Sequence, residues 1–355
     1  MRTLRPSWTR EQGKRNMRRC LAIGLILSLL FTGCAQPGKK GQYQAAYLDV
    51  FDTVTSITAQ AESEDAFREQ AEKIHDRLLR CHQLFDIYND YAGLNNLKTV
   101  NDNAGIAPVK VDGEIIRLLQ DCRAYYELTD HAVNAAMGSV LQLWHEARTA
   151  GLENPEQAAL PEDTALKNAA AHTDWAAVEI DEEAGTVYLS DPELRLDVGA
   201  VAKGWSAQRA AEAAPEGFLI SVGGNVCATG PKDNSGTPWV VGITDPDGGA
   251  DYLHTLYDTD SAIVTSGDYQ RYYVVGGVRY HHIIDPETLY PAGRFRSVTV
   301  ICGDSGLADA LSTALFVLPR EEGEALAQSC GAEAMWVDTE GNCFYTPGFS
   351  NWICQ

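Results

Sequence analysis

The chain has 355 residues, of which 45% are hydrophobic and 22% are charged, and its formal net charge at pH 7 is -21. This length suits one large domain or two closely packed ones, and the apolar content is that of a globular protein. A surface this acidic argues against nucleic acid as a partner and against electrostatic adhesion to anionic lipid.

The N-terminus has the pattern of a signal peptide. Arginines at positions 15, 18 and 19 precede an apolar run over residues 21–31, and small residues then lead to Cys34. The run is too short to predict a transmembrane span. We therefore expect residues 1–33 to be a signal peptide with a lipobox-like end, and Cys34 to carry a lipid that anchors the protein at the extracytoplasmic side of the cell membrane. A plain cleaved signal and an uncleaved anchor are the alternatives, and Met17 is a second candidate start.

The exported part is expected to consist of a short tether and one functional domain. Residues 34–45 are polar and rich in Gly, Gln and Lys, as flexible linkers are. Residues 46–355 carry the strand and helix patterns, and we interpret them as one domain of two intimate subdomains.

Strand and helix patterns alternate along this domain. Helical periodicity occurs at 63–85, at 113–129, in the second half of 131–144, in the Ala-rich segment that ends at Ala214, and around Asp309. Strand patterns occur at 47–59, on both sides of 183–185, and at 218–222, 239–243, 262–264, 272–280, 297–302, 334–337 and 343–345. Glycines at 223–224 and 276–277 mark tight turns. Many strands in hairpins with a few long helices predict an α+β fold of mostly antiparallel or mixed sheets with several packed helices.

Polar residues cluster between Thr265 and Thr313. The sequence Thr-Ser-Gly-Asp at 265–268 suits a loop where a ligand approaches the main chain, and Ile283-Ile284 suggests a buried β-like pair that ends at Asp285-Pro286. Asp309 and Thr313 are four residues apart in a helical run, so both oxygens lie on one face and could hold a hard cation such as Mg²⁺.

Each of these residues also has a purely structural interpretation. Asp309 could be a helix N-terminal charge, Thr313 could bond back to its own helix, and His282 could be a satisfied core histidine. Their clustering in one segment favours a site.

A second candidate anion-binding element covers Asp197 to Gly204. We expect a strand that ends in a Gly turn and enters a helix, which presents free backbone N–H groups to an anion. An anionic ligand in so acidic a protein needs a local cation, which Lys203 or a bound metal would supply.

Six segments in this order resemble the ApbE family of FAD:protein FMN transferases. They are Phe51-Asp52-Thr53, Asp197 to Gly204, Val222 to Asn225, Thr265 to Tyr269, His282 to Pro286 and Ala308 to Thr313. The lipoprotein-like start is similar to that of many family members as well.

The resemblance implies an activity and its partners. FAD is the substrate, its pyrophosphate lies against Mg²⁺, and FMN is transferred to a threonine hydroxyl of an acceptor flavoprotein while AMP is released. The acceptor threonine lies in an Asp-Gly-x-Thr type sequence. This chain has no such sequence, so it is expected to act on another protein.

The resemblance also assigns roles to individual positions. Asp309 and Thr313, with the carbonyl of Ala200, would hold Mg²⁺. Asp197, Lys203 and Ile283 would contact FAD, and the flavin side would be lined by Phe51, Tyr88, Ala132, Val133 and Asn134. His282 and Asp268 are the candidates for orienting or deprotonating the acceptor hydroxyl.

The chain departs from the family pattern at two places. Leu289 replaces the glycine of the usual Asp-Pro-x-Thr-Gly sequence, and Val133-Asn134-Ala135-Ala136 replaces Phe-Asp-x-Thr. Two rival functions therefore stay open. The first is a Mg²⁺-dependent FAD pyrophosphatase, in which water replaces threonine, and the second is a non-catalytic lipoprotein that binds flavin.

Overall fold

The structure is a computed structural model that describes residues 40–249 and 252–354. The predicted signal peptide and Cys34 lie outside the described residues, so both stay predictions. The helices within residues 40–249 and 252–354 include none with the length and hydropathy of a membrane span.

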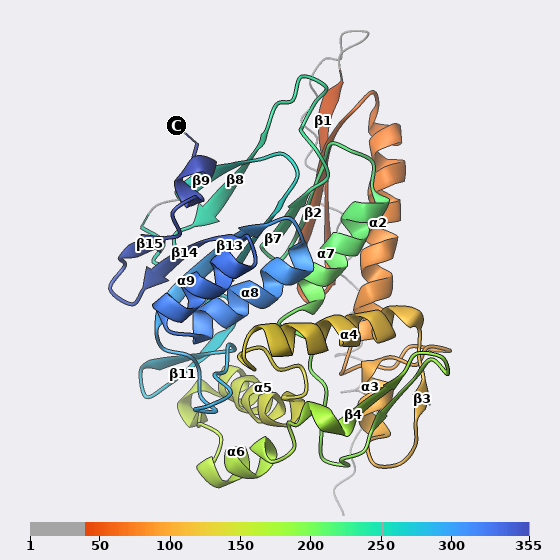
Figure 1. Ribbon diagram of the computed structural model, residues 1–355, viewed down its shortest axis with the longest axis vertical. Coiled ribbons are helices and arrows are strands. Elements are labelled where there is room, and N and C mark those ends of the chain that lie inside the picture. The colour runs from red at the N-terminus through yellow and green to blue at the C-terminus, as the bar shows by residue number, and fades with distance from the viewer. Residues whose placement is uncertain (1–39, 250–251, 355) are drawn as a thin grey trace, which may run out of the picture. The chain divides into compact units, whose positions relative to one another are not determined.

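An eight-stranded antiparallel sheet is the centre of the fold (Figure 1). Its spatial order is β1-β2-β6-β7-β10-β13-β14-β15. The strands are β1 (Gly41–Val50), β2 (Thr53–Ala61), β6 (Phe218–Val222), β7 (Asn225–Ala228), β10 (Ala262–Gly267), β13 (Phe295–Cys302), β14 (Glu333–Asp338) and β15 (Cys343–Tyr345). All neighbouring pairs are antiparallel, which confirms the predicted α+β class.

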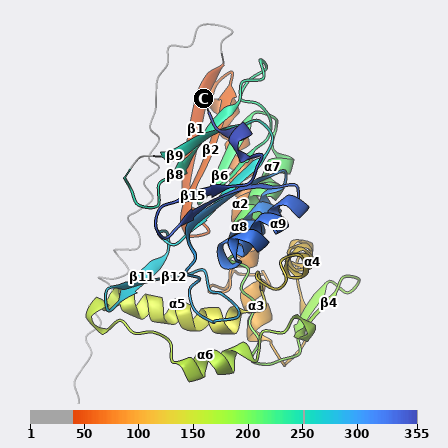
Figure 2. The ribbon, with the colours of Figure 1, turned by 60° about the vertical axis from the view of Figure 1, so that its left-hand side comes forward.

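Helices cover one face of this sheet and a small hairpin covers the other. The helices are α2 (Glu64–Phe85), α7 (Ala202–Ala213), α8 (Ser305–Val317) and α9 (Arg320–Ser329), and Figure 2 shows them as a layer beside the strands. The hairpin consists of β8 (Trp239–Thr244) and β9 (Tyr252–Asp258). Its inward side chains share a core with the outer face of the sheet and with η3 (Phe349–Trp352).

A mostly helical region follows α2 in the chain and packs below α7 and α8 in the view of Figure 1. It contains α3 (Leu97–Asp102), α4 (Gly113–Leu128), α5 (Gly138–Glu153), η1 (Pro155–Gln157), α6 (Asp163–Ala170) and η2 (Trp175–Ala177). A three-stranded sheet of β3 (Val109–Lys110), β5 (Thr186–Leu189) and β4 (Val178–Asp181) completes it. The hairpin of β11 (Tyr272–Val275) and β12 (Val278–His281) packs against α5.

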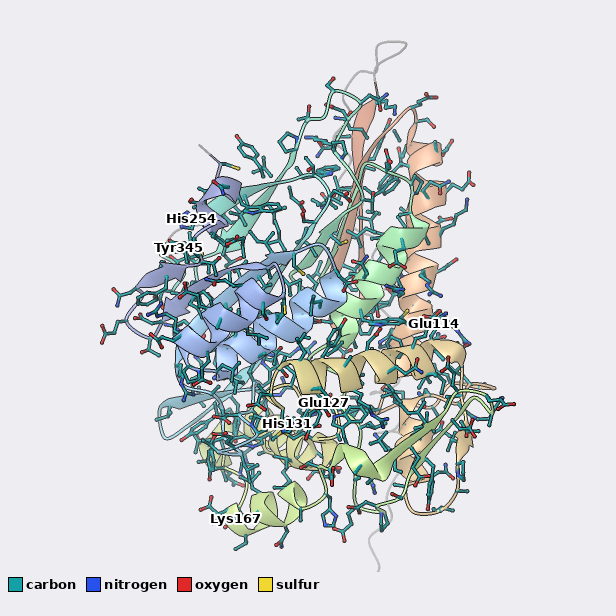
Figure 3. All side chains as sticks on the ribbon, viewed as in Figure 1. Glu114, Glu127, His131, Lys167, His254 and Tyr345 are labelled. Carbon is teal, nitrogen blue, oxygen red and sulfur yellow. The ribbon has the colours of Figure 1, made fainter. Side chains whose placement is uncertain are left out.

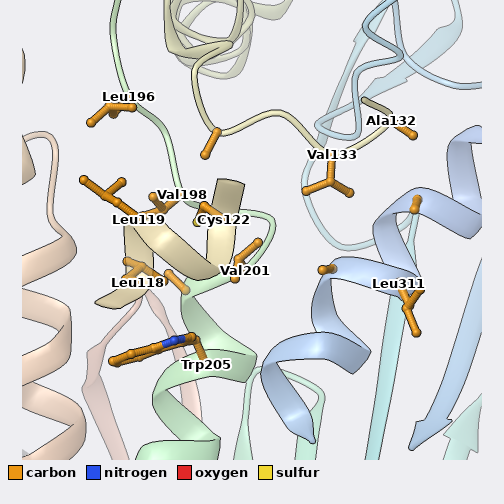
Figure 4. Packing of buried hydrophobic residues seen from close by; sticks show 14 of the residues in the cluster. Leu118, Leu119, Cys122, Ala132, Val133, Leu196, Val198, Val201, Trp205 and Leu311 are labelled. Atoms are coloured by element: carbon orange, nitrogen blue, oxygen red, sulfur yellow. The ribbon is translucent and has the colours of Figure 1, made fainter. Parts of the chain in front are cut away.

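One continuous hydrophobic core joins this region to the main sheet. Figure 4 shows Leu118 and Leu119 of α4 close to Val198 and to Trp205 of α7, and all four are buried. A polar contact holds the same helix at its start, at Glu114, which is labelled in Figure 3. Glu114 accepts a hydrogen bond of 2.8 Å from Arg77 of α2. The predicted division into two subdomains stays a prediction.

The ends of α2, α4 and α7 agree with the sequence patterns to within one residue, whereas α5 continues past the predicted end at Trp144 to Glu153. The predictions contain no counterpart of α3, α6 or α9. Ser63 is the N-cap of α2, since its side chain accepts a hydrogen bond from the N–H of Ala66 at 3.2 Å. Two glycine turns have the predicted positive φ, at Gly223-Gly224 between β6 and β7 and at Gly276-Gly277 between β11 and β12.

Several strand predictions were wrong. β1 begins at Gly41, so residues 41–45 belong to the sheet and not to the tether. Residues 47–59 form parts of two strands, because the chain reverses at Phe51-Asp52. Thr265, Ser266 and Gly267 continue β10 and do not form a loop.

Two shorter segments also differ from their predictions. Ile283 and Ile284 are buried, but they lie outside the named strands, and Ile284 makes only an isolated bridge to Pro291. The strand predicted to lead into the turn at 197–201 is absent from the named strands of the described part. Just before this turn, Arg195 makes only an isolated bridge to Met137. The helix that follows this turn, α7, is present as expected.

Candidate active site

A cavity of about 780 Å³ opens where the edge of the helical region meets α7, α8 and the ends of several strands. Of the sequence-predicted site residues, all those in the described part except Asp268 line it. They are Phe51, Tyr88, Ala132, Val133, Asn134, Asp197, Ala200, Lys203, His282, Ile283, Asp309 and Thr313. Segments far apart in the sequence, from Phe51 to Thr313, therefore converge on one site.

Asp309 is the central acid of this cavity. Its carboxylate is 2% exposed and accepts a hydrogen bond of 2.8 Å from the N–H of Gly204, in the first turn of α7. Lys203 Nζ lies 3.4 Å from Asp309 Oδ2. Burial raises the pKa of Asp309, and the ammonium of Lys203 and the Gly204 N–H oppose this rise. The carboxylate is thus held in a fixed position where two helices meet.

The close approach of α7 and α8 depends on Gly204. A Cβ atom at this position would lie 2.2 Å from the carbonyl oxygen of Ser305 and 2.5 Å from Cβ of Asp309. No side chain fits there, so only glycine allows the first turn of α7 to reach Asp309.

Asp309, Thr313 and Ala200 line the same cavity, and between them they carry a carboxylate, a hydroxyl and a backbone carbonyl. Hard cations such as Mg²⁺ prefer oxygen donors of this kind. Among the described residues, no group of three or more His, Cys, Asp or Glu side chains could hold a metal ion. A site with one carboxylate suits Mg²⁺, which commonly binds proteins through one or two carboxylates and takes further ligands from substrate phosphates and water.

The two adjacent histidines have different environments. Both ring nitrogens of His281 are used inside the protein, since Nε2 lies 2.8 Å from the carbonyl oxygen of Ala292 and Nδ1 accepts the N–H of Ile283 at 3.2 Å. His282 lines the cavity, and its Nδ1 is buried without a hydrogen-bond partner in the described part. Burial, with the nearby cations Arg271 and Lys203, lowers the pKa of His282 to about 3. His282 is therefore neutral in the unliganded protein, and Nδ1 is its ring nitrogen without a partner in the described part.

The structure does not bring Asp268 to the cavity. Its carboxylate pairs with Arg296 Nε at 2.8 Å and with Arg279 Nη1 at 3.4 Å. Because both oxygens are engaged by guanidinium groups, Asp268 is suited to holding β10, β12 and β13 together. Of the two predicted candidates for deprotonation, the geometry favours His282.

Two of the residues predicted to line the flavin side, Phe51 and Asn134, lie on a turn with positive φ and on a hydrogen-bonded loop. Phe51 and Asp52 connect β1 to β2 with φ values of 54° and 50°. Two-residue hairpin loops of type I′ need such values, which cost most L-residues about 1–2 kcal/mol each. The side chain of Asn134 holds its own loop, since Nδ2 donates to Thr173 O at 3.0 Å and Oδ1 accepts from Ala136 N at 2.8 Å.

The turn that carries Phe51 rests on the glycine turn between β6 and β7. A Cβ on Gly223 would lie 2.5 Å from Oγ1 of Thr53, so a glycine is required where the two turns meet. Both turns border the cavity.

Sequence reasoning missed several polar residues of the cavity, among them Arg271, His145 and Asp86. Arg271 follows the Thr265–Tyr269 motif closely, and its guanidinium donates to the carbonyl of Phe51 at 3.0 Å. His145 of α5 is hydrogen-bonded to Tyr88. The carboxylate of Asp86 accepts from the N–H of Tyr88 at 2.6 Å and so shapes the loop after α2.

A sequence signal for His145 did exist. Met137, Leu141 and His145 all line the cavity and recur at intervals of four residues, which places them on one side of α5. No comparable periodicity marks Arg271 or Asp86, because both lie outside helices and strands.

Comparison with known proteins gives this arrangement a family. The model of the ApbE family matches residues 51–336. This chain belongs to the ApbE family. Its relatives include the FAD:protein FMN transferases of Treponema pallidum, 36% identical over 68% of this chain and 70% of the relative, and of Klebsiella pneumoniae, 34% identical over 74% and 83%.

Solved structures agree with the family assignment. The ApbE protein of Thermotoga maritima superposes with a TM-score of 0.78 at 32% identity, covering 89% of this chain and 100% of that one. The flavin transferase ApbE from Vibrio cholerae has a TM-score of 0.73 at 24% identity over 88% of this chain and 99% of that one, which supports the fold. The resemblance inferred from the six sequence segments is confirmed.

Proposed function

We propose that this protein is a Mg²⁺-dependent FAD:protein FMN transferase, which moves FMN from FAD to a threonine hydroxyl of an acceptor flavoprotein and releases AMP. The acceptor carries an Asp-Gly-x-Thr type sequence. Membership of the ApbE family and the names of its relatives support the class of reaction. The observation that carries the proposal is that His282, Lys203, Asp309, Thr313 and Ala200 line one cavity.

The reaction exchanges the phosphoanhydride bond of FAD for a phosphoester bond to the acceptor threonine. The threonine oxygen bonds to the FMN phosphorus, the bond between that phosphorus and the bridging oxygen breaks, and AMP leaves with the bridging oxygen. The hydroxyl proton passes to the imidazole of His282, whose pKa the negative phosphates of bound FAD would raise from about 3. A threonine hydroxyl is a weak nucleophile, so a positioned base contributes about 10²–10⁴ in rate.

The other cavity residues bind and orient the substrate. Asp309, Thr313 and the carbonyl of Ala200 would hold Mg²⁺, and this ion would neutralise phosphate charge when bound. Lys203 adds a cation beside Asp309. Phe51 and Val133 present apolar surface to a flavin ring, while Ile283 and Asp197 line the same cavity.

Product analysis tests the proposal. Purified protein is incubated with FAD, Mg²⁺ and an acceptor protein that carries an Asp-Gly-x-Thr sequence. We expect fluorescent, covalently flavinylated acceptor and an equimolar amount of AMP, and we expect Asp309→Asn to lose both. Free FMN with AMP would instead indicate an FAD pyrophosphatase, and FAD binding without any AMP would indicate a non-catalytic flavin-binding protein.

We also propose that the protein acts at the extracytoplasmic side of the cell membrane, anchored by a lipid on Cys34. The support is the sequence pattern of residues 15–34, in which arginines, an apolar run and small residues precede the cysteine. Radiolabelled fatty acid should enter the wild-type protein in cells and should not enter Cys34→Ala. Equal labelling of both would contradict this anchor.

A further inference from the structure

Two hydrogen bonds from distant residues hold the backbone of the turn that carries Phe51. Both of its residues have positive φ, which Asp52 tolerates better than most residues but which an aromatic residue such as Phe51 rarely adopts. The N–H of Phe51 donates to Nδ1 of His82 at 3.3 Å. The carbonyl of Phe51 accepts from Nη2 of Arg271 at 3.0 Å, across 220 residues of sequence.

Arg271 is available for this task because it has no acidic partner. No ion pair involves Arg271 among residues 40–249 and 252–354, although the chain has an excess of acidic residues. A half-buried arginine usually pairs with a carboxylate, whereas this one donates to a backbone carbonyl on the wall of the cavity. A charged donor makes a stronger hydrogen bond than a neutral one.

The position of Arg271 in the chain connects this contact to the other wall. The β11–β12 hairpin begins directly after Arg271 and ends directly before His282, and both residues line the cavity. A movement of Arg271 would therefore displace both the Phe51 turn and His282.

We propose that Arg271 is a positioning residue, which locks the strained Phe51-Asp52 turn so that the Phe51 ring stays in place to receive the flavin. Arg271 acts through Phe51 and not by contacting the ligand. This inference rests on the proposed binding of FAD in the cavity.

A double-mutant cycle tests whether Arg271 acts through Phe51. FAD affinity is measured by flavin fluorescence with EDTA present, for wild type, Arg271→Met, Phe51→Ala and the double variant. We expect each single substitution to raise the Kd about 10-fold, and the double variant to match Phe51→Ala within about two-fold. Losses that multiply to about 100-fold would overturn the proposal, because they would show that Arg271 binds FAD independently.

A matched control separates this role from a general loss of stability. Arg294 also donates to a backbone carbonyl, that of Val317 at 2.9 Å, and it does not line the cavity. Arg294→Met should leave the Kd for FAD within about two-fold of wild type. Arg271→Lys, which keeps a charged donor, should recover part of the affinity, and a Kd as poor as that of Arg271→Met would count against the proposal.

Hydrogen exchange of the unliganded protein tests the same contact without FAD. Arg271→Met should speed exchange of the amides at 51–54 by about 10-fold or more and leave those of β13 unchanged. Unchanged exchange at 51–54 would overturn the proposal. If the wild type fails to bind FAD, the proposed function fails, and this exchange measurement still decides whether Arg271 holds the turn.

Discussion

The main-chain N–H of Gly204 donates a hydrogen bond of 2.8 Å to the Asp309 carboxylate on a different helix. This contact fixes the Asp309 carboxylate in the cavity. It requires glycine at position 204, because α8 leaves no room there for a side chain. The cavity geometry is therefore built on the meeting of α7 and α8.

Gly204→Ala should be strongly disruptive. The new Cβ would overlap the backbone of Ser305 and Cβ of Asp309. We expect a loss of about 1–3 kcal/mol in the free energy of unfolding, measured by urea denaturation, together with loss of flavin transfer.

Gly113, at the start of α4, provides the control for this substitution. A Cβ atom on Gly113 would meet no neighbouring group of the described chain within 4 Å. Gly113→Ala should therefore be neutral or slightly stabilising, because alanine favours the helix. Equal effects of the two substitutions would contradict the packing argument.

His282 and Asp268 should respond differently to mutation. His282→Gln removes the base in the cavity and should lower kcat/KM for transfer by about 10²–10⁴. Asp268→Asn weakens the pairs with Arg279 and Arg296, and should cost about 1–3 kcal/mol of unfolding free energy with a change in kcat/KM of only a few-fold. A collapse of kcat/KM in a stably folded Asp268→Asn protein would restore Asp268 as the base.

Stability should depend on pH through His282. The pKa of this residue is lowered to about 3 in the folded protein, from an ordinary value of 6.5. Between these values the unfolded chain binds the proton and the folded chain does not. This group therefore costs no stability above about pH 6.5, and the free energy of unfolding falls as pH falls toward 3. The slope from this group is about 1.4 kcal/mol per pH unit. Urea denaturation at about pH 4.5 and about pH 6.5 should show a shallower slope for His282→Gln than for wild type, and equal slopes would refute the burial argument.

Leu289 occupies a position that favours glycine. Its φ is 64°, and the family pattern has a glycine at this place. Leu289→Gly should be more stable than Leu289→Ala by about 1 kcal/mol, because only glycine adopts this conformation without strain. Leu318, at φ -68°, provides the comparison, and there the alanine variant should be the more stable one. Thermal unfolding of the four variants measures both orders, and the same order at both positions would contradict the prediction.

Local chemistry predicts much of this fold. The Ser63 cap, the glycine turns at 223–224 and 276–277 and the shared face of Asp309 and Thr313 all follow from short-range rules. The turn at Phe51-Asp52 does not, because Phe51 rarely adopts positive φ and the alternating pattern continues through the turn. The polar sequence at 265–267 predicts a loop but forms a strand, because its side chains bond across the sheet and to α8, as Ser266 does to Ser312 at 2.8 Å.

The site is harder to predict where a role depends on distant partners. Nothing near Asp268 in the sequence indicates that Arg296 occupies its carboxylate. The contact between Arg271 and Phe51 spans 220 residues and uses a backbone carbonyl, which every residue possesses. His281 and His282 are adjacent and chemically identical, so the sequence does not indicate that His282 lines the cavity while His281 bonds inside the protein.

The most direct test is a crystal structure of the protein with FAD and Mn²⁺, a stand-in for Mg²⁺ with a usable anomalous signal. The account predicts an anomalous peak in the cavity at about 2.0–2.3 Å from oxygens of Asp309, Thr313 and Ala200, with the FAD phosphates on its open side. A peak away from these three residues, or FAD bound outside this cavity, would contradict it.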